Sequence, residues 1–329
     1  MGGNPMVYSG AVDRIKGRPA PKTGDMVLVS DGSENPIGWG LYNSVSMYCV
    51  RLMQLEQDAT RDPSCILNME NLLQKRFSAA MDLRTSLGLP SADTNVYRLI
   101  NSEGDRLSGL IVDVFGEVAV IASSAAWVEK YRQQIESLVS QVSGIRHTWW
   151  RSSVDILKEE GLQVEQSHSP VAQKFKVVEN GVYYQVSPEG QKTGFYADQR
   201  ENRRLISSLS KDKKVLDLCC YTGGFSLGAL LGGAHHVTGV DSSMSAIELA
   251  NENIHLNNLD HERISFVKED VNEFMKQALL RNEEWDLGAA SMSGRRIGVL
   301  RQGGAGCDHP INPSYPEGEY LTNILLSLS

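Results

Sequence analysis

The first sixty residues alternate between hydrophobic and polar positions, which is the pattern of half-buried β-strands. Three alternating stretches, DMVLVSDG, IGWGLYN and MYCVRLMQ, are separated by Gly, Pro, Asn and Asp residues that favour turns. The stretch NPMVYSGAV near the start already has the composition of structured chain. The pattern therefore predicts a small β-barrel or half-barrel over residues 1–60.

The next part of the chain mixes helical and extended patterns. Residues 62–87 place Leu, Phe and Met at spacings of three and four, which predicts a helix. An extended pattern follows from Tyr97, then a helix in AAWVEKYRQQIESLVSQV and a strand in HTWWRSS. KFKVVENGVYYQVSP has Asn-Gly between two alternating runs, a strong β-hairpin signal. We therefore expect a second domain, of the α+β class, over residues 61–189.

From about residue 190 the chain alternates between strands and helices. KVLDLCC, HVTGVD and ISFVKED have the pattern of short buried strands, and each is followed by a helical stretch. Three βα units in succession predict a parallel, doubly wound sheet with right-handed crossovers. The fold class expected for residues 190–329 is therefore α/β.

Composition excludes several classes of protein. The 329 residues are 41% hydrophobic and 22% charged, and no apolar run is long enough to span a membrane. The first residues lack the features of a secretory or transit peptide. Five cysteines without a CxxC pair indicate neither a disulfide framework nor a metal site. We expect a cytoplasmic protein, with an organellar full-length form left open.

The charge distribution leaves one local basic segment. A net charge of -8 argues against a protein that coats nucleic acid without specificity. QRENRRLISSLSKDKK nevertheless gathers several cations, which form either a solvated helix face or a set of phosphate contacts: Arg200, Arg203, Arg204, Lys211, Lys213 and Lys214.

The turn after the first strand of the α/β region, CCYTGGFS, predicts a cofactor loop. Gly223 and Gly224 allow a tight turn and a close approach of the backbone to a ligand. The loop is not GxGxxG, and Tyr221 disfavours a pyrophosphate-binding dinucleotide site. An adenosine that carries a sulfonium amino acid is the better match.

Two acids stand at the ends of the following strands. Asp241 ends the second strand, where a carboxylate can accept both ribose hydroxyls. Asp270 ends the third strand and is placed to meet an adenine edge. The alternative for each acid is a role as the N-cap of the helix that follows.

Two stretches of this region are similar to one known family. SPEGQKTGFYADQRENR, followed by VLDLCCYTGGFSLGALLGGA, resembles the PUA-domain-containing family of class I S-adenosylmethionine-dependent methyltransferases. The resemblance implies methylation of C5 of a cytosine in large-subunit ribosomal RNA. The KTGFYADQR run is its most specific part, because few other families combine it with a DxxxYTGGF loop.

The resemblance extends over nearly the whole chain. The N-terminal segment resembles a PUA domain, a small RNA-binding pseudobarrel, shortened here by one strand. The middle segment resembles the family's linking α+β domain, and DHPINPSYPEGEYL resembles its C-terminal signature. The implied architecture is a Rossmann-like methyltransferase domain preceded by a small α+β domain and a partial PUA-like barrel.

The resemblance also implies functional residues. Phe195 and Tyr196 could cover the adenosine or stack on an extruded base, and Arg200 could hold the methionyl carboxylate or a phosphate. The alternative is a helix start with ordinary packing aromatics. The implied cofactor site comprises Phe195, Tyr196, Gln199, Arg200, Asp217, Tyr221, Thr222, Gly223, Gly224, Asp241 and Asp270, and the implied RNA contacts are Asp198, Arg203 and Arg204.

The sequence departs from the family where the chemistry is done. The family's Asp-Pro-Pro-Lys loop should follow WDL within a few residues, yet Leu287 continues directly into GAASMSGRRIGVLRQ. The Cys-bearing segment at the end of the fifth strand is missing as well. We therefore expect an internal deletion of roughly sixty or more residues after Leu287, with strands four and five missing from the sheet. The first strand would then expose an edge.

The missing segments have a chemical consequence. C5 of cytosine becomes nucleophilic only after a thiolate adds at C6, and that thiolate comes from an absent loop. The catalytic residue is therefore unknown. Cys219, Cys220 and Cys307 are expected to be structural thiols, and Cys307, close to His309, is the one weak candidate for a nucleophile.

Two functions stay open at this point. The first is a methyltransferase of ribosomal RNA that is inactive or weakly active in this form. The second is a non-catalytic isoform that binds RNA, S-adenosylmethionine or both. A small-molecule methyltransferase is disfavoured by the PUA-like segment. Ribosomal RNA is the expected partner and a homodimer is considered, with no membrane partner.

Overall fold

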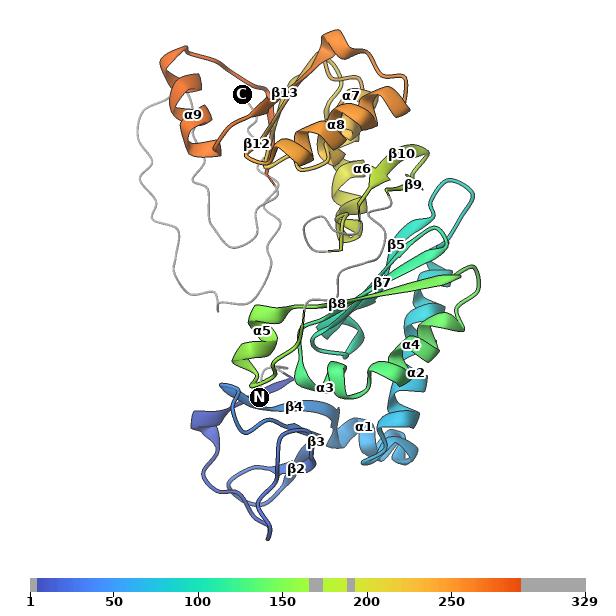
Figure 1. Cartoon of the computed structure of the whole chain (residues 1–329), viewed down its shortest axis with the longest axis vertical. Coiled ribbons are helices and arrows are strands. Elements are labelled where there is room, and N and C mark those ends of the chain that lie inside the picture. Colours follow the sequence, from blue (N-terminus) through green and yellow to red (C-terminus); the bar gives the residue numbers. More distant parts are fainter. Residues whose placement is uncertain (1–4, 166–173, 188–192, 291–329) are drawn as a thin grey trace. The chain divides into compact units, whose positions relative to one another are not determined.

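The structure is a computed structural model that describes residues 5–165, 174–187 and 193–290 (Figure 1). The chain divides into two compact units. The first contains Met1–Gly181 and Ser187–Ala197, and the second contains Val182–Val186 and Asp198–Ser329.

The N-terminal sheet of the first unit has four antiparallel strands in the order β1-β4-β3-β2. The three stretches predicted as strands correspond to β2, β3 and β4, so that prediction is confirmed. The strands are β1 (Met6–Tyr8), β2 (Met26–Ser30), β3 (Pro36–Tyr42) and β4 (Tyr48–Leu55). Helix α1 (Glu56–Arg61) follows β4 directly.

A second four-stranded sheet in the first unit has the order β5-β6-β7-β8. β7 and β8 are parallel, and the chain connects them through α3 and α4. The elements are α2 (Met69–Ser86), β5 (Val96–Asn101), β6 (Leu110–Phe115), β7 (Val118–Ser123), α3 (Ala126–Lys130), α4 (Arg132–Ser140), β8 (His147–Ser152), α5 (Val154–Glu159) and β9 (Phe175–Glu179).

One hydrophobic core serves both sheets of the first unit. Trp39 and Met53 from the N-terminal sheet belong to the same buried cluster as Phe77 of α2 and Ile121 of β7. The Trp39 indole nitrogen donates to Gln54 Oε1 at 2.8 Å, so the buried polar atom of the tryptophan is satisfied. The sequence regions on either side of residue 60 therefore share a core.

The second unit contains a parallel sheet in the order β13-β12-β11-β14. The predicted βα alternation and the parallel sheet are confirmed. The elements are β10 (Val182–Val186), α6 (Arg200–Leu209), β11 (Lys214–Leu218), α7 (Gly224–Leu231), β12 (His236–Asp241), α8 (Met244–Leu256), β13 (Ile264–Lys268), α9 (Val271–Leu280) and β14 (Leu287–Ala290).

The expectation that the fourth strand is missing is wrong. β14 pairs with β11 in parallel, with Leu287 opposite Val215 and Ala290 opposite Leu218. The backbone nitrogen of Lys214 donates to Asp286 Oδ2 at 2.8 Å, which fixes the start of the pairing. The pairing covers the edge of β11 that was expected to be exposed, and Leu287 and Ala289 of β14 are buried. The expected absence of a fifth strand concerns positions outside the described residues.

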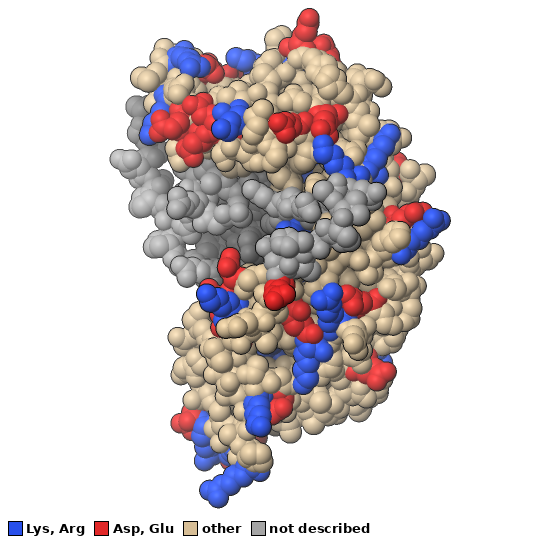
Figure 2. Space-filling model, viewed as in Figure 1, with Lys and Arg blue, Asp and Glu red and all other residues tan. Residues whose placement is uncertain are grey.

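The surface carries charges of both signs. Acidic and basic side chains are interspersed on the face shown in Figure 2. Exposed pairs such as Arg14 with Glu34 and Arg132 with Glu136 contribute at most about 1 kcal/mol each. Among the described helices, none is both long and apolar enough to cross a membrane.

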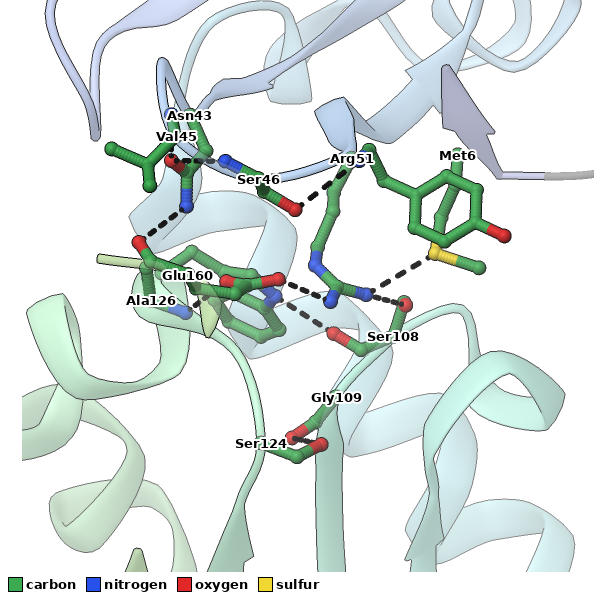
Figure 3. A network of polar contacts seen from close by, with 12 residues as sticks. Met6, Asn43, Val45, Ser46, Arg51, Ser108, Gly109, Ser124, Ala126 and Glu160 are labelled. Atoms are coloured by element: carbon green, nitrogen blue, oxygen red, sulfur yellow. Dashed lines mark hydrogen bonds and ion pairs between the residues drawn. The ribbon is translucent and has the colours of Figure 1, made fainter. Parts of the chain in front are cut away.

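A buried ion pair joins β4 of the N-terminal sheet to Glu160, the residue that follows α5 (Figure 3). Arg51 of β4 lies 2.6 Å from Glu160 Oε1, and both side chains are largely buried. Arg51 also donates to Ser108 Oγ at 2.7 Å. The other Glu160 oxygen accepts from the Ala126 amide at 2.7 Å, and its backbone carbonyl accepts from Asn43. Both terminal nitrogens of Arg51 and both carboxylate oxygens of Glu160 thus have a partner.

We expect Arg51→Met to lower the free energy of unfolding by about 3 kcal/mol, because Glu160 would stay buried without its cation. Urea denaturation followed by tryptophan fluorescence measures the change. The matched control, Arg14→Met, breaks an exposed pair and should change the free energy by less than about 1 kcal/mol. Equal losses in the two variants would contradict the role assigned to the buried pair.

Candidate cofactor site

The turn from β11 into α7 has an unusual backbone. Cys219, Tyr221 and Gly223 have positive φ angles of 56°, 50° and 78°. The left-handed conformation costs about 1–2 kcal/mol for a residue with a Cβ atom, so the surrounding structure imposes it on Cys219 and Tyr221. Strain of this kind is concentrated at ligand-binding sites. The predicted tight glycine turn is present at Gly223.

Three hydrogen bonds fix three consecutive residues of this turn. The Cys220 amide donates to the carbonyl of Val240 at 3.0 Å. The Tyr221 amide donates to Asp241 Oδ2 at 2.9 Å, and the Thr222 carbonyl accepts from Asn253 Nδ2 at 3.0 Å. We call residues 219–223 the cofactor loop. Its backbone is held from β12 on one side and from α8 on the other.

Gly223 of the cofactor loop and Gly224, the first residue of α7, both face protein atoms. A Cβ on Gly223 would lie 2.9 Å from Phe266 and 3.0 Å from Leu227. A Cβ on Gly224 would lie 3.1 Å from the Arg203 side chain. The absent side chains therefore permit close packing inside the unit, in addition to the left-handed turn at Gly223.

Asp217 is the most buried acid of the site. Its Oδ2 accepts from the Ser226 amide at 3.0 Å and from the Ser226 hydroxyl at 2.6 Å. Its Oδ1 is buried and has no hydrogen-bond partner among the described residues. Burial raises the pKa of Asp217 to about 7, and the nearby Asp241 carboxylate also raises it. When Asp217 is ionised, the site thus contains an acceptor atom that a bound donor could satisfy.

The two acids at the strand ends have different environments. Asp241 is half-buried, and its oxygens accept from the amides of Tyr221 and Ser243. Ser243, rather than Asp241, is the N-cap of α8. Asp270 is exposed and is the N-cap of α9, accepting from the amides of Asn272 and Glu273. The structure therefore brings Asp241 to the cofactor loop and shows Asp270 in the capping role considered as its alternative.

The basic segment does not form a single solvated face. Arg203 is 5% exposed, packs against the start of α7, and lowers the pKa of Asp217 by its charge. Arg204 and Asp198 are exposed. Arg200 pairs with the neighbouring Glu201, while Gln199 is buried. Only part of this segment is thus available to a nucleic acid.

The two aromatic residues implied by the resemblance belong to the first unit. Phe195 is 2% exposed and Tyr196 is half-buried. The hydroxyl of Thr193 donates to Asp113 Oδ2 at 2.6 Å, and Asp113 forms an ion pair with Arg98. These contacts anchor the start of the TGFYADQR segment in the first unit.

The two cysteines of the cofactor loop are poor nucleophiles. Burial and the carboxylates of Asp241, Asp217 and Asp270 raise the pKa of Cys219 to about 11. Burial also raises the pKa of the Cys220 thiol far above its usual range. Both remain protonated at neutral pH, which agrees with the structural role expected of them. Cys307 lies outside the described residues, and in the described part of the chain no cluster of three or more His, Cys, Asp or Glu could hold a metal ion.

Sequence reasoning missed two residues of the site. Ser226 lies in the first turn of α7 and satisfies one oxygen of Asp217. Asn253 reaches the cofactor loop from α8 and is fully buried. The position of Ser226, directly after the Gly-Gly-Phe turn, could have signalled its role. Nothing in the local sequence distinguishes Asn253 from its neighbouring asparagines.

Comparison with known proteins defines the class. Residues 163–288 match the family of S-adenosylmethionine-dependent methyltransferases, and residues 2–55 match the PUA-like domain family. A candidate SAM-dependent methyltransferase from Streptococcus mutans has the same fold, with a TM-score of 0.67 at 22% identity, covering 87% of this chain and 72% of that chain. A candidate methyltransferase crystallised with S-adenosylhomocysteine gives the same score and identity, covering 87% and 71%. The fold is that of a class I methyltransferase with a PUA-like domain, and the cofactor of this class is S-adenosylmethionine.

Two relatives identify the family. Ribosomal RNA large subunit methyltransferase I of Alteromonas mediterranea is 30% identical over 387 positions, covering 99% of this chain and 95% of the relative. The protein of the same name from Pseudoalteromonas translucida is 32% identical over 279 positions, covering 83% and 68%. The chain therefore belongs to the ribosomal RNA large subunit methyltransferase I family.

The lengths of these two alignments agree with the expected internal deletion. The longer one has 387 positions for a chain of 329 residues, so at least 58 positions (387 - 329) contain a residue of the relative alone. The shorter one spans 83% of the chain, about 273 residues, in 279 positions, so this chain has few gaps within it. The methyltransferase match ends at residue 288, next to Leu287.

The raised pKa of Asp217 predicts a pH dependence of stability. Between the unfolded value of 3.8 and the folded value of about 7, the unfolded state releases a proton that the folded state retains. Wild-type stability relative to Asp217→Asn should therefore fall as the pH rises from 4 to 7 and level off above 7. Urea denaturation at several pH values measures the difference. The control, Asp13→Asn, removes the same charge from an exposed position. A difference that is independent of pH would contradict the raised value.

Proposed function

We propose that this chain binds S-adenosylmethionine in its second unit and ribosomal RNA, and that in this form it does not transfer the methyl group. One observation supports cofactor binding above all. The Tyr221 amide of the strained cofactor loop donates a hydrogen bond to Asp241. Asp217 Oδ1 is buried and has no hydrogen-bond partner among the described residues. A site whose carboxylate oxygens can accept further hydrogen bonds, next to a loop with a fixed backbone conformation, is suited to a ligand that carries hydrogen-bond donors.

The described residues fit this cofactor. Asp241 still has acceptor capacity, because each carboxylate oxygen accepts up to two hydrogen bonds, and it can take the ribose hydroxyls. Asp217 Oδ1 can accept from the methionyl ammonium group, directly or through a water molecule. When bound, S-adenosylmethionine supplies an electrophilic methyl group on a sulfonium. The role of this chain's residues is to bind and orient that group.

The proposal for RNA follows from the family. The relatives are named as methyltransferases of large-subunit ribosomal RNA, and the N-terminal segment matches a PUA-like domain. We propose that the atom methylated by the family is C5 of a cytosine. We also propose that this chain is cytoplasmic. Its sequence is proposed to contain three domains, at residues 1–60, 61–189 and 190–329. Arg204 and Asp198, both exposed, are the candidates for contact with the substrate.

The proposal that no methyl group is transferred follows from chemistry. Activation of C5 needs a thiolate, and the two cysteines of the cofactor loop are protonated at neutral pH. The sequence contains no Asp-Pro-Pro-Lys loop. Cofactor binding and methyl transfer are thereby separated in this chain, and the two can be measured independently.

Binding of S-adenosylhomocysteine, measured by isothermal titration calorimetry, tests the site. We expect Asp241→Ala to weaken binding about 10–100-fold, because it removes charge-assisted hydrogen bonds to the ribose and to the cofactor loop. The control, Asp260→Ala, removes an exposed acid elsewhere in the same unit. Unchanged affinity in Asp241→Ala, or tight binding of NAD in place of S-adenosylhomocysteine, would overturn the assignment.

Methyl transfer from labelled S-adenosylmethionine to ribosomal RNA tests the second part of the proposal. We expect incorporation at background level with protein that binds S-adenosylhomocysteine in calorimetry. A relative from the same family, such as the Alteromonas mediterranea protein, serves as the positive control. Incorporation that matches the relative would show that this chain activates the acceptor base by other residues.

A further inference from the structure

Two asparagine side chains of helix α8 form hydrogen bonds with backbone groups along one edge of strand β10. The Tyr183 amide donates to Asn257 Oδ1 at 2.8 Å, and the Tyr183 carbonyl accepts from Asn257 Nδ2 at 2.7 Å. Two residues further along β10, the Gln185 amide donates to Asn253 Oδ1 at 2.6 Å. The spacing matches, because one helical turn of four residues rises about 6 Å and two strand residues rise about 6.6 Å.

The two asparagines differ in where their second bond goes. The side-chain amide of Asn257 donates to the backbone carbonyls of Tyr183 in β10 and of Asn253 in α8. Asn253 donates to the carbonyl of Thr222 in the cofactor loop at 3.0 Å. Asn253 is 0% exposed and Thr222 is 2% exposed, so water cannot replace this bond.

The orientation of the Asn253 amide follows from its partners. Gln185 presents a backbone N–H, which needs the oxygen, and Thr222 presents a carbonyl, which needs the nitrogen. A flipped amide would place two donors against each other and two acceptors against each other. The side chain therefore bridges β10 and the cofactor loop in one direction only.

We propose that Asn253 is a positioning residue that couples β10 to the cofactor loop. Thr222 lies between Tyr221 and Gly223, both in the left-handed region, so its carbonyl direction helps to define the loop shape. β10 is the strand that precedes the TGFYADQR segment in sequence. Cofactor binding at the loop and the order of β10 should therefore depend on each other through one amide group. This inference rests on the proposed binding of S-adenosylmethionine.

The isosteric variant Asn253→Asp tests the coupling. It keeps the acceptor for Gln185 and removes the donor to Thr222, so we expect S-adenosylhomocysteine to bind about tenfold more weakly or worse. The matched control, Asn257→Asp, removes a bond to the Tyr183 carbonyl of β10 but keeps the link from Asn253 to Thr222, so it should change the Kd by no more than about twofold. Equal effects of the two variants on the Kd would overturn the proposal.

Hydrogen exchange on the wild-type protein provides a test that needs no variant. Addition of S-adenosylhomocysteine should slow exchange of the Gln185 amide several-fold, while the Ile121 amide of the first unit is unchanged. If wild-type protein binds the ligand and Gln185 does not respond, the coupling is wrong although the proposed function stands. If wild-type protein does not bind the ligand, the proposed function itself fails.

Discussion

The parallel pairing of β11 with β12 is the constraint on which the candidate site depends. In this register Asp217 lies opposite Gly239 and Leu218 lies opposite Val240, so both strands end at the same edge of the sheet. The Asp241 carboxylate then lies within 2.9 Å of the Tyr221 amide. A shift by one residue would move every side chain of the strand to the other face and remove this contact.

The charges that the pairing brings together select the kind of ligand. Burial raises the pKa of Asp217 to about 7, and the charge of the nearby Asp241 carboxylate adds to this effect. Arg203 offsets part of the negative charge. A diphosphate would add negative charge beside two acids, whereas the sulfonium and ammonium groups of S-adenosylmethionine are cations. Electrostatics therefore favour this cofactor over a dinucleotide.

The features that could be predicted from the sequence are those determined by neighbouring residues. The Asn-Gly turn at residues 180–181 lies between β9 and β10, and KVLDLCC contains β11, because turn chemistry and apolar runs act locally. The link from Asn253 to Thr222 joins residues 31 positions apart and depends on how α8 packs. A Cβ atom on Gly224 would point toward the Arg203 side chain, and this proximity likewise depends on helix packing.

The location of the fourth strand bears on the proposal that this chain binds the cofactor without transferring the methyl group. β14 covers β11 with Leu287 and Ala289, and Asp286 fixes its start, so β11 is paired on both sides by residue 290. The cofactor loop, Asp241 and Asn253 all precede that point in the chain. The Asp-Pro-Pro-Lys loop that the resemblance places after the WDL stretch would follow it. The residues of the proposed cofactor site thus precede the expected position of the segment that would activate the acceptor.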